Sequence, residues 1–571
     1  MAQPNSPPSG RIKELGLDSR LESMLDEEWG IEKLYPPQSE ALPLSLSGRN
    51  LMLAAPTASG KSLVAYLTIV QRLISDLKGG LALYLVPLKA LGSEKFDELK
   101  EIASKVDLKV GLAIGDSGAE TRTIEESDIL VCTSEKLDSI LRNRPQLMER
   151  VRIVVSDEFH LLDNRDRGPT LEIVLSRLRH MNQDTQVIAL SATVGNAESI
   201  AEWLDAELVS SDWRPVALQY GTITEFHREL KLDVHRIDGP EDAVLPESRL
   251  IESEENNPLK IILEDKLSRG EQMLIFVSTR ASAKKEAREL SQHLLKIFSK
   301  DKSEIGSELT EKWRRLANGI LGKEDTTETV KSLGKYLKGG VAFHHAGLSP
   351  KHRRMVEESF KRGEISCIVA TPTLAQGVNL PSRTVVIRDF KRWPDGYLPV
   401  REILQMMGRA GRPKFDQTGE SWILVKEIDD FEPESAKKIA GKYFHGKTED
   451  IESRLSNLEA KSVEEDTSLL THVLSMVATG GTSDRDALGR FFSNTLLSKQ
   501  LGKEDLIERI DDVISWLVYN GMVERVGESD EVKARIINRG PEEESEEWED
   551  ELPSWAKAVT QIEGLELSSN S

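Results

Sequence analysis

The sequence predicts an α/β protein: two tandem α/β domains, then a mostly helical module of winged-helix type, then an acidic, disordered tail. Apolar strand-like runs alternate with helical patterns from about residue 30 to about 430, as parallel α/β domains do. Between residues 468 and 526 the apolar periodicity is wholly helical, and it closes in a turn and a short strand. A plain helical bundle gives a similar pattern, so that alternative stays open for the third module.

These patterns set the expected domain limits. The two α/β series separate near Trp213-Arg214-Pro215-Val216. Residues 281–337 are helical, charged and poor in β-branched residues, which predicts a helical insertion without chemistry. We expect a flexible N-terminus over 1–22, α/β domains over 23–215 and 216–430, a winged-helix domain over 431–530 and an acidic tail over 531–571.

Each α/β domain is expected to contain a series of short buried strands, because apolar runs of strand length recur along it. In the first domain the expected strands are 51–54, 81–86, 129–132, 151–156 and 187–190. In the second domain they are 273–277, 341–343, 365–370, 385–387 and 421–425.

The net charge of −21 is distributed unevenly along the chain. Residues 331–412 hold fifteen Lys or Arg against six Asp or Glu, whereas residues 541–571 hold ten acidic residues against Lys557. The basic block indicates a docking surface for a polyanion such as nucleic acid. Its alternative interpretation is an ordinary solvated surface.

Composition argues against several other classes of protein. No run of 18 or more apolar residues occurs, and residues 1–10 lack the apolar region of a signal peptide, so we expect a cytoplasmic protein with no membrane association. Cys132 and Cys367 each lie in an apolar run, which predicts buried thiols and no disulfide. Two cysteines and ten scattered histidines give no zinc spacing, so Mg²⁺ is the only metal expected.

The most informative stretch is a phosphate-binding loop between an apolar run and a helical pattern. Small residues let backbone N–H groups close around phosphates at a helix N-terminus. Lys61 is expected to reach the β- and γ-phosphates, and the Ser62 hydroxyl to ligate Mg²⁺. Ala55 stands in place of the usual first glycine, so the loop alone is moderately specific. The residues of the loop are Ala55, Pro56, Thr57, Ala58, Ser59, Gly60, Lys61 and Ser62.

An acidic pair that could act together with this loop lies about a hundred residues later in the sequence. Asp157 and Glu158 follow the apolar run 151–155, so they are expected at the carboxyl end of a buried strand. Asp157 can hold Mg²⁺ there. Glu158 can orient and deprotonate an attacking water. The order and spacing of the two motifs predict one nucleotide site in one domain.

An arginine pair lies far from this loop in the sequence. Arg409 and Arg412 stand three residues apart on one face of an expected helix. This is what an arginine finger from a neighbouring domain looks like: it stabilises the charge on a transferring phosphoryl group only when the domains close. The alternative is an ordinary pair of surface charges. Ser191-Ala192-Thr193, at another expected strand end, could link the nucleotide site to domain movement.

This ordered set of motifs resembles the superfamily 2 DEAD/DEAH-box (DExH) helicases. The stretch Asp157-Glu158-Phe159-His160, with 343–348 and 405–412, is similar to the Ski-like branch, and within it to archaeal Hjm-type DNA repair helicases. Residues 446–455 and 472–475 fit the winged-helix region of that family more loosely. The resemblance covers about residues 30–530 and implies two RecA-like P-loop domains.

The resemblance implies further residues of the nucleotide site. It matches Gln38 to the glutamine that reads adenine, which makes ATP the expected nucleotide with Mg²⁺ as its metal. It matches Gln405, Arg409 and Arg412 to the contribution of the second domain to hydrolysis. Gly377, in the stretch 371–379 after a second-domain strand, is placed in the same nucleotide site.

The resemblance also implies a groove for a nucleic-acid strand and a hairpin that splits the duplex. The hairpin is expected over 388–397, where Pro394-Asp395-Gly396 is a credible turn. Trp393 and Tyr397 beside it either stack on the last base pair or pack the hairpin. The residues matched to the strand groove are Lys89, Thr133, Ser134, Ser278, Arg280 and Thr371.

The expected function is that of an ATP-dependent helicase that moves 3′ to 5′ on single-stranded and forked DNA, in repair or replication-fork processing. Such a protein would be associated with the nucleoid. An RNA helicase or ribonucleoprotein remodeller of the same branch is an alternative, since backbone contacts carry little base information. A nucleic-acid-stimulated ATPase clamp that never unwinds is another.

The chain is expected to depart from the family at its end, because only some forty residues, with a strongly acidic stretch, stand where the family has a helical ratchet domain. These residues are either a solubilising tail or a mimic of a nucleic-acid strand. As a mimic, the tail would compete in the basic groove or dock on a protein partner.

Overall fold

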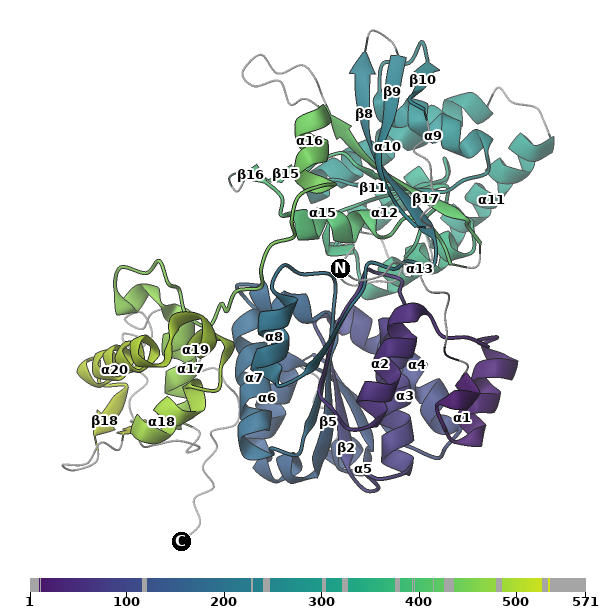
Figure 1. Cartoon of the computed structure of the whole chain (residues 1–571). Coiled ribbons are helices and arrows are strands. Elements are labelled where there is room, and N and C mark those ends of the chain that lie inside the picture. Colours follow the sequence, from purple (N-terminus) through teal and green to yellow (C-terminus); the bar gives the residue numbers. More distant parts are fainter. Residues whose placement is uncertain are drawn as a thin grey trace.

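The computed structural model describes residues 10, 12–115, 121–226, 229–239, 247–299, 304–320, 327–374, 380–392, 394, 396–413, 415–425, 436–478, 485–525 and 532–534. Over these residues two sheets lie one above the other, and the C-terminal helices lie beside the lower sheet (Figure 1). Among them, no helix is both long and apolar enough to cross a membrane.

The first domain is built on a sheet in which all the described strands are parallel, in the order β3-β4-β2-β5-β6-β1-β7. The inner strands are buried on both faces because helices cover both, as apolar runs of this kind require, whereas the edge strands β3 and β7 are partly exposed. Parallel strands bring all their carboxyl ends to one edge, which is where ligands bind in such sheets. The strands are β1 (Leu51–Ala54), β2 (Leu81–Val86), β3 (Val110–Ala113), β4 (Ile129–Thr133), β5 (Val151–Ser156), β6 (Gln186–Ser191) and β7 (Glu207–Ser210).

Alternate residues of β1 point into two separate cores, Leu51 and Leu53 into one and Met52 and Ala54 into the other. Helices of the first core are α1 (Ser19–Ser23), α2 (Pro36–Leu46), α3 (Lys61–Ile74) and α4 (Lys89–Ser104). Around the second core lie α6 (Ser134–Asn143), α7 (Gly168–Met181) and α8 (Ala197–Leu204). The remaining short helices are η1 (Ile12–Glu14), η2 (Met24–Glu28), α5 (Thr121–Glu126), η3 (Pro145–Arg150) and η4 (Phe159–Asp163).

The N-terminal segment differs from the flexible stretch expected over 1–22. Residues 12–14 and 19–23 are helical, and Ile12, Leu17 and Leu21 are buried in the first core. Asp18 caps α1 by accepting a hydrogen bond from the Arg20 amide. The apolar residues spaced along 12–25 indicate helices that pack on a core. The prolines before them favoured the interpretation of a flexible segment.

The second domain is built on a mixed sheet in the order β10-β9-β8-β17-β14-β11-β13-β12, and it begins at Ala217, seven residues after β7 ends at Ser210. Its central strands are parallel, whereas β8, β9 and β10 pair antiparallel. Its strands are β8 (Ala217–Phe226), β9 (Glu229–Asp238), β10 (Arg249–Glu252), β11 (Met273–Phe276), β12 (Val341–His344), β13 (Cys367–Ala370), β14 (Thr384–Ile387) and β17 (Thr418–Val425), with a hairpin of β15 (Lys391–Arg392) and β16 (Gly396–Tyr397).

The described residues of the expected helical insertion over 281–337 are mainly helical, and Trp313 among them is fully buried in the core of the second domain, edge-on to Phe298. The segment therefore completes this core. The helices of the domain are α9 (Pro258–Ser268), α10 (Arg280–Phe298), α11 (Glu304–Ile320), α12 (Glu328–Leu337), α13 (Pro350–Lys361), α15 (Val400–Met407) and α16 (Ala436–Tyr443).

The third module has the expected winged-helix form of helices and a small antiparallel wing. Its wing strand at 532–534 falls in the stretch expected to be acidic tail; the rest of that tail, 535–571, lies outside the described residues. Its elements are η5 (Val463–Glu465), α17 (Thr467–Ala478), α18 (Arg485–Phe492), α19 (Leu496–Leu501), α20 (Lys503–Tyr519), β18 (Val523–Arg525) and β19 (Val532–Ala534).

This module packs on the first domain, as Figure 1 shows for the helices beside α7 and α8. The Trp203 indole donates to the Asn494 carbonyl at 2.9 Å. The fully buried Glu172 carboxylate of α7 accepts hydrogen bonds from the Leu497 amide and the Ser453 hydroxyl. Burial raises the pKa of Glu172 to about 7, because few donors replace the water that the carboxylate loses.

We therefore expect Glu172→Gln to stabilise the protein at neutral pH. The folded pKa lies above the ordinary 4.5, so the stability that this group contributes is present below pH 4.5 and is lost as the pH rises through about 7. A glutamine keeps both hydrogen bonds without ionising. Urea unfolding at pH 8 should show a gain of about 3 kcal/mol, which disappears below about pH 4. Glu198→Gln, at an exposed position of α8, is the control; an identical pH profile for Glu172→Gln and wild type would contradict this account.

Candidate active site

The phosphate-binding loop connects β1 to α3 at the carboxyl edge of the first sheet. Gly60 has a left-handed backbone (φ +78°), and a Cβ there would lie 2.2 Å from the Gln38 amide nitrogen, so glycine is required on both counts. Lys61 begins α3, and its ammonium donates to the carbonyls of Ala55 and Pro56 at 2.6 and 2.9 Å. The loop therefore presents a helix N-terminus and a lysine at one point, which suits a phosphate.

Gln38, matched to adenine recognition, is buried beside this loop. Its side-chain oxygen accepts from the Tyr35 amide at 2.8 Å, and its nitrogen donates to the Gly60 carbonyl at 2.9 Å. The Tyr35 ring packs on Trp213, with ring centroids 4.6 Å apart, just before the second domain begins. Gln38 thus joins the start of α2 to the phosphate loop.

The acidic pair follows β5 directly, on the strand neighbouring β6 and β2. The Asp157 carboxylate accepts from the Tyr84 hydroxyl at 2.8 Å and from the Glu158 amide at 2.9 Å. Burial raises the pKa of Asp157, and the nearby Lys95 ammonium opposes that shift. Glu158 has a left-handed backbone (φ +51°), a strained state for a non-glycine residue that costs about 1 kcal/mol and is typical of active sites.

Two of the three residues expected from the second domain reach this edge. Gln405 on α15 lies 2.5 Å from the Nε2 atom of His160, and Arg409 is buried in electrostatic contact with Glu158 and Lys61. The Gly408 carbonyl accepts from Arg214 at 3.0 Å. This hydrogen bond fixes the turn between Gln405 and Arg409. The candidate site is therefore a composite of two domains.

His160 carries one proton shared by defined partners. The Ala192 amide can only donate, and it points at the Nδ1 atom of His160 at 3.5 Å. The Glu158 carboxylate also lies 3.5 Å from Nδ1, and the side-chain nitrogen of Gln405 lies 2.5 Å from Nε2. Burial lowers the pKa of His160 to about 3, so the ring is neutral at physiological pH.

Arg412 lies elsewhere. Its guanidinium binds Asp416 through two hydrogen bonds of 2.9 Å and also donates to Gln272, within the second domain. The Phe415 ring lies 5.9 Å from it. The structure thus separates the two arginines that the sequence pairs: Arg409 lies at the composite site, and Arg412 holds its own domain together.

The residues matched to the strand groove lie at the carboxyl ends of four strands: Lys89 after β2, Thr133 and Ser134 at β4, Ser278 and Arg280 after β11, and Thr371 after β13. Several are already engaged locally. Thr133 caps α6 by accepting from the Lys136 amide, and the amide and hydroxyl of Ser278 donate to Asp389. The residues matched to the groove therefore lie at the carboxyl edges of both sheets, and Thr133 and Ser278 are held by local hydrogen bonds.

The expected hairpin exists as β15 and β16. The Tyr397 ring stacks on Phe390, with ring centroids 6.1 Å apart, and the ammonium groups of Lys391 and Lys442 lie 4.7 and 5.5 Å from its centroid. These contacts support the packing alternative for Tyr397. Trp393 and Gly377 lie outside the described residues.

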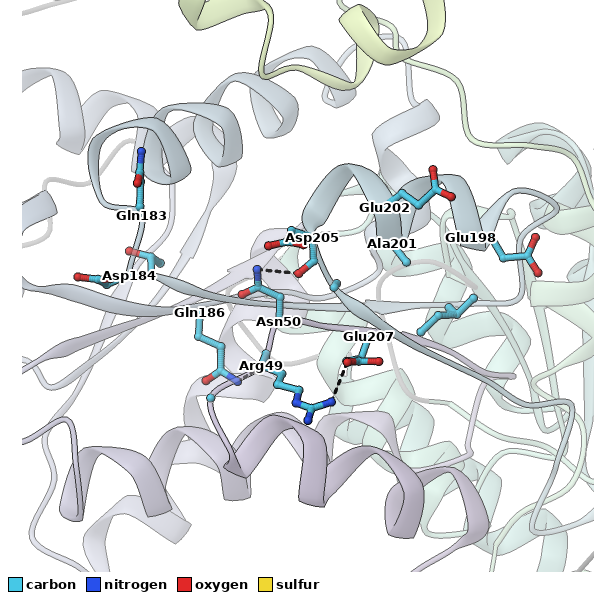
Figure 2. A pocket seen from close by; sticks show the side chains of 14 residues that line it. Arg49, Asn50, Gln183, Asp184, Gln186, Glu198, Ala201, Glu202, Asp205 and Glu207 are labelled. Carbon is cyan, nitrogen blue, oxygen red and sulfur yellow. Dashed lines mark hydrogen bonds and ion pairs between the residues drawn. The ribbon is translucent and has the colours of Figure 1, made fainter.

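A hollow of about 800 Å³ lies far from these residues, at the amino ends of β1, β6 and β7 (Figure 2). Its wall includes the ion pair of Arg49 with Glu207 at 2.8 Å, and Asn50, whose amide donates to the Leu204 carbonyl at 3.0 Å. It contains none of the residues singled out above, and its polar groups join neighbouring loops of the first domain.

Sequence reasoning missed an ion-pair junction where the parts of the chain meet. Asp163, at the end of η4, binds Arg401 of α15 at 2.5 Å and Arg454, in the segment before the third module, at 2.6 Å. The Glu449 carboxylate accepts from the first two backbone amides of α15, at 2.6 and 3.0 Å, so it caps the helix that carries Gln405. Glu449 and Arg454 lie in the stretch 446–455 that resembles the family, but the sequence assigned them no role, because their partners are far away in the sequence.

The segment that contains Glu449 also lies against the first domain. The Gly195 amide donates to the Glu449 carbonyl at 3.3 Å, and Asn196 exchanges two hydrogen bonds with the backbone of Ile451, at 2.8 and 2.9 Å. A Cβ on Gly195 would lie 2.3 Å from Asp450, so only glycine allows this approach. The segment runs from the second domain along the first and into the third module.

Known families match the three parts of the chain in order. Residues 35–200 match the DEAD/DEAH box helicase family, residues 320–414 the helicase conserved C-terminal domain, and residues 434–524 a helix-turn-helix domain. With two RecA-like sheets and a composite P-loop site, the chain is a member of the DEAD/DEAH-box helicase class.

Similar curated proteins give a narrower placement. The chain is 39% identical over 526 residues to the ATP-dependent DNA helicase Hel308 of Methanocella arvoryzae, covering 90% of this chain and 65% of that protein. It is also 39% identical over 530 residues to Hel308 of Pyrococcus horikoshii, covering 92% of this chain and 67% of that protein. The chain belongs to the Hel308 family, and it spans about two thirds of the length of these relatives.

Asp163→Ala is expected to loosen the junction between the two domains. The change leaves Arg401 and Arg454 without their shared carboxylate, and removing one partner of a largely buried ion pair costs about 3 kcal/mol. Urea unfolding followed by a probe in the second domain measures the loss. Asp166→Ala, on the exposed part of the same loop, should change stability by less than about 0.5 kcal/mol. Equal effects of the two substitutions would show that Asp163 does not hold the domains.

Proposed function

We propose that the chain is an ATP-dependent helicase that moves 3′ to 5′ on single-stranded DNA and separates forked DNA, in repair or replication-fork processing. The observation that carries this proposal is the composite site: Gln405 and Arg409 of one domain meet His160 and Glu158 of the other. A site shared between two domains forms and breaks as they close and open. The names of the relatives support DNA as the nucleic acid, so a DNA-specific protein would associate with the nucleoid.

ATP fits the site by the chemistry of the residues present. The loop amides at the N-terminus of α3 and the Lys61 ammonium suit the phosphates. Gln38 holds the loop through Gly60 and lies at the expected adenine side. The Arg409 guanidinium, held near Glu158, would neutralise charge that develops on the transferring phosphoryl group.

Mg²⁺ fits as well, because its preferred ligands are hard oxygens and the site supplies the Ser62 hydroxyl and the Asp157 carboxylate. The Lys95 ammonium donates to Ser62 and interacts electrostatically with Asp157, so the two groups lie near each other. Bound Mg²⁺ would supply charge that neutralises the phosphates. Glu158, next to Asp157, would hold the attacking water and accept its proton.

Coupling of hydrolysis to movement would run through α15. Its Gln405 meets the neutral His160 behind the acidic pair, and its Arg401 is held by Asp163. Loss of the γ-phosphate would remove the charge that Arg409 and Lys61 share. The domains would then separate, and the polar groups at the two strand edges would change their spacing along a bound strand.

The decisive experiment compares ATP hydrolysis with matched DNA and RNA oligonucleotides, followed by strand separation of duplexes with 3′ or 5′ tails. The proposal expects stimulation by DNA and separation of 3′-tailed duplexes. Greater stimulation by RNA would make the chain an RNA helicase of the same class. Stimulated hydrolysis with neither duplex opened would make it an ATPase clamp.

Lys61→Ala is expected to abolish hydrolysis through loss of phosphate binding, whereas Glu158→Gln should bind nucleotide normally and lose about 10² to 10⁴ in turnover. The reason is that Lys61 contacts phosphate and Glu158 acts on water. Titration with a fluorescent ATP analogue beside steady-state hydrolysis separates the two defects. Lys78→Ala, an exposed lysine just after α3, is the control. Near-wild-type turnover of Glu158→Gln would rule it out as the base.

Arg409→Ala and Arg412→Ala should differ, because only Arg409 lies at the composite site. For Arg409→Ala we expect unchanged nucleotide affinity and a fall of about 10³ to 10⁵ in turnover. For Arg412→Ala we expect a loss of stability of about 1 kcal/mol, since the Asp416 pair is part-exposed, with turnover within about tenfold of wild type. Equal loss of turnover in two well-folded variants would mean that Arg412 reaches the phosphates after a domain movement.

A further inference from the structure

A buried polar cluster links the metal side of the candidate site to helix α4. The Lys95 ammonium donates to the Ser62 hydroxyl and to the Glu98 carboxylate, both at 3.1 Å. The Tyr66 hydroxyl donates to the same Glu98 carboxylate, and the Tyr84 hydroxyl donates to Asp157. The cluster therefore contacts both residues expected to hold Mg²⁺, one on each side.

Lys95 joins three secondary-structure elements within this cluster. Its side chain is 11% exposed, although lysine is seldom buried without an ionic partner. Its ammonium pairs with the Glu98 carboxylate at 3.1 Å and is attracted by the Asp157 carboxylate. The residue is thus an ionic contact between α4, the start of α3 and the end of β5.

The same helix begins at the strand groove. Lys89, matched to strand binding, is the first residue of α4, six residues before Lys95. This spacing corresponds to about 9 Å along a helix, less than two turns. Gly92, midway between them, packs closely on Ile114 and Val86. A helix segment this short and well packed moves as a unit, so a displacement at one lysine is transmitted to the other.

The charges around Lys95 explain how binding at the metal side of the site could affect helix α4. The Lys95 ammonium donates to Ser62 and is attracted by Asp157, the same two residues that would hold a divalent cation. A dication bound between those oxygens therefore alters the forces on the ammonium and, through it, on the position of α4. By linkage, a strand that holds α4 at Lys89 changes the binding of the metal–nucleotide complex by the same factor.

We propose that Lys95 is a positioning residue that couples Mg²⁺–nucleotide binding at Ser62 and Asp157 to strand binding at Lys89, with α4 as the rigid connection. The inference rests on the proposed function, since it concerns the same nucleotide site and groove. It assigns a role to a side chain that belongs to none of the nucleotide-site or groove motifs.

The test measures a ratio of affinities in the full chain. Fluorescence anisotropy gives the dissociation constant of a labelled single-stranded oligonucleotide, with and without Mg²⁺ and a non-hydrolysable ATP analogue. The ratio of the two constants is the coupling factor, which is about 5 to 150 for typical linked sites. Lys95→Met should bring this factor to within about twofold of one, and Lys95→Arg, which keeps charge and reach, should restore part of it.

Lys100→Met is the matched control, because Lys100 lies on the exposed side of the same helix with its ammonium 5.6 Å from the Phe96 ring. It should keep the wild-type factor. A thermal unfolding scan of each variant identifies any that fail to fold, in which case Lys95→Arg and Glu98→Gln carry the comparison. Glu98→Gln should weaken the coupling less than Lys95→Met does.

Two results would overturn the proposal: a wild-type factor of one, or a wild-type factor retained in Lys95→Met. Either is distinct from failure of the proposed function, which would appear as wild-type protein without strand-stimulated ATP hydrolysis. A loss of nucleotide affinity in Lys95→Met with an unchanged coupling factor would also overturn it, because Lys95 would then only support the local packing of Ser62.

Discussion

The composite site depends on the position of one helix, α15. Glu449 caps its first turn, Arg401 fixes it to Asp163, and Gln405 on its inner face meets His160. Two of these partners, His160 and Asp163, belong to η4 of the first domain, whereas Glu449 belongs to the segment before the third module. The contacts of Glu449 and of Arg401 involve charged groups. Charge-assisted hydrogen bonds in a water-poor interface are strong but demand accurate geometry. The interface therefore has a small number of acceptable arrangements, which suits a site that must assemble and come apart.

The sequence was sufficient for local features and insufficient for long-range ones. Strand runs, the phosphate loop and the acidic pair depend on neighbouring residues, and each lies in the structure where a parallel sheet must place it. The long antiparallel β8 and β9 were not predicted, although 230–234 alternates apolar and polar residues. For the arginines, Asp416 four residues after Arg412 was a local signal that went unused, whereas the place of Arg409 beside Glu158 depends on a contact between domains.

The third module has the form of a winged helix, and its longest helix is acidic. This helix, α20, carries five acidic residues against two basic ones, and one of the acids, Asp511, pairs with Arg485. Phosphates are repelled by a helix of this charge. The module is bound to the first domain through Glu172 and Trp203. In this structure its helices α18 and α19 therefore pack against α7 and α8.

Because the third module packs on the first domain, the first and third parts of the chain lie together, and the second domain is inserted between them in the sequence. The second domain leaves the first near Ser210 and is tied back to it at Gly195 and Asn196, through the segment that contains Glu449 and Ile451. The second domain is therefore held to the first at both ends of its chain segment, in addition to the contacts that Arg401 and Gln405 make. Attachment at both ends limits how far the two domains can separate, because neither end of the second domain is free to leave the first.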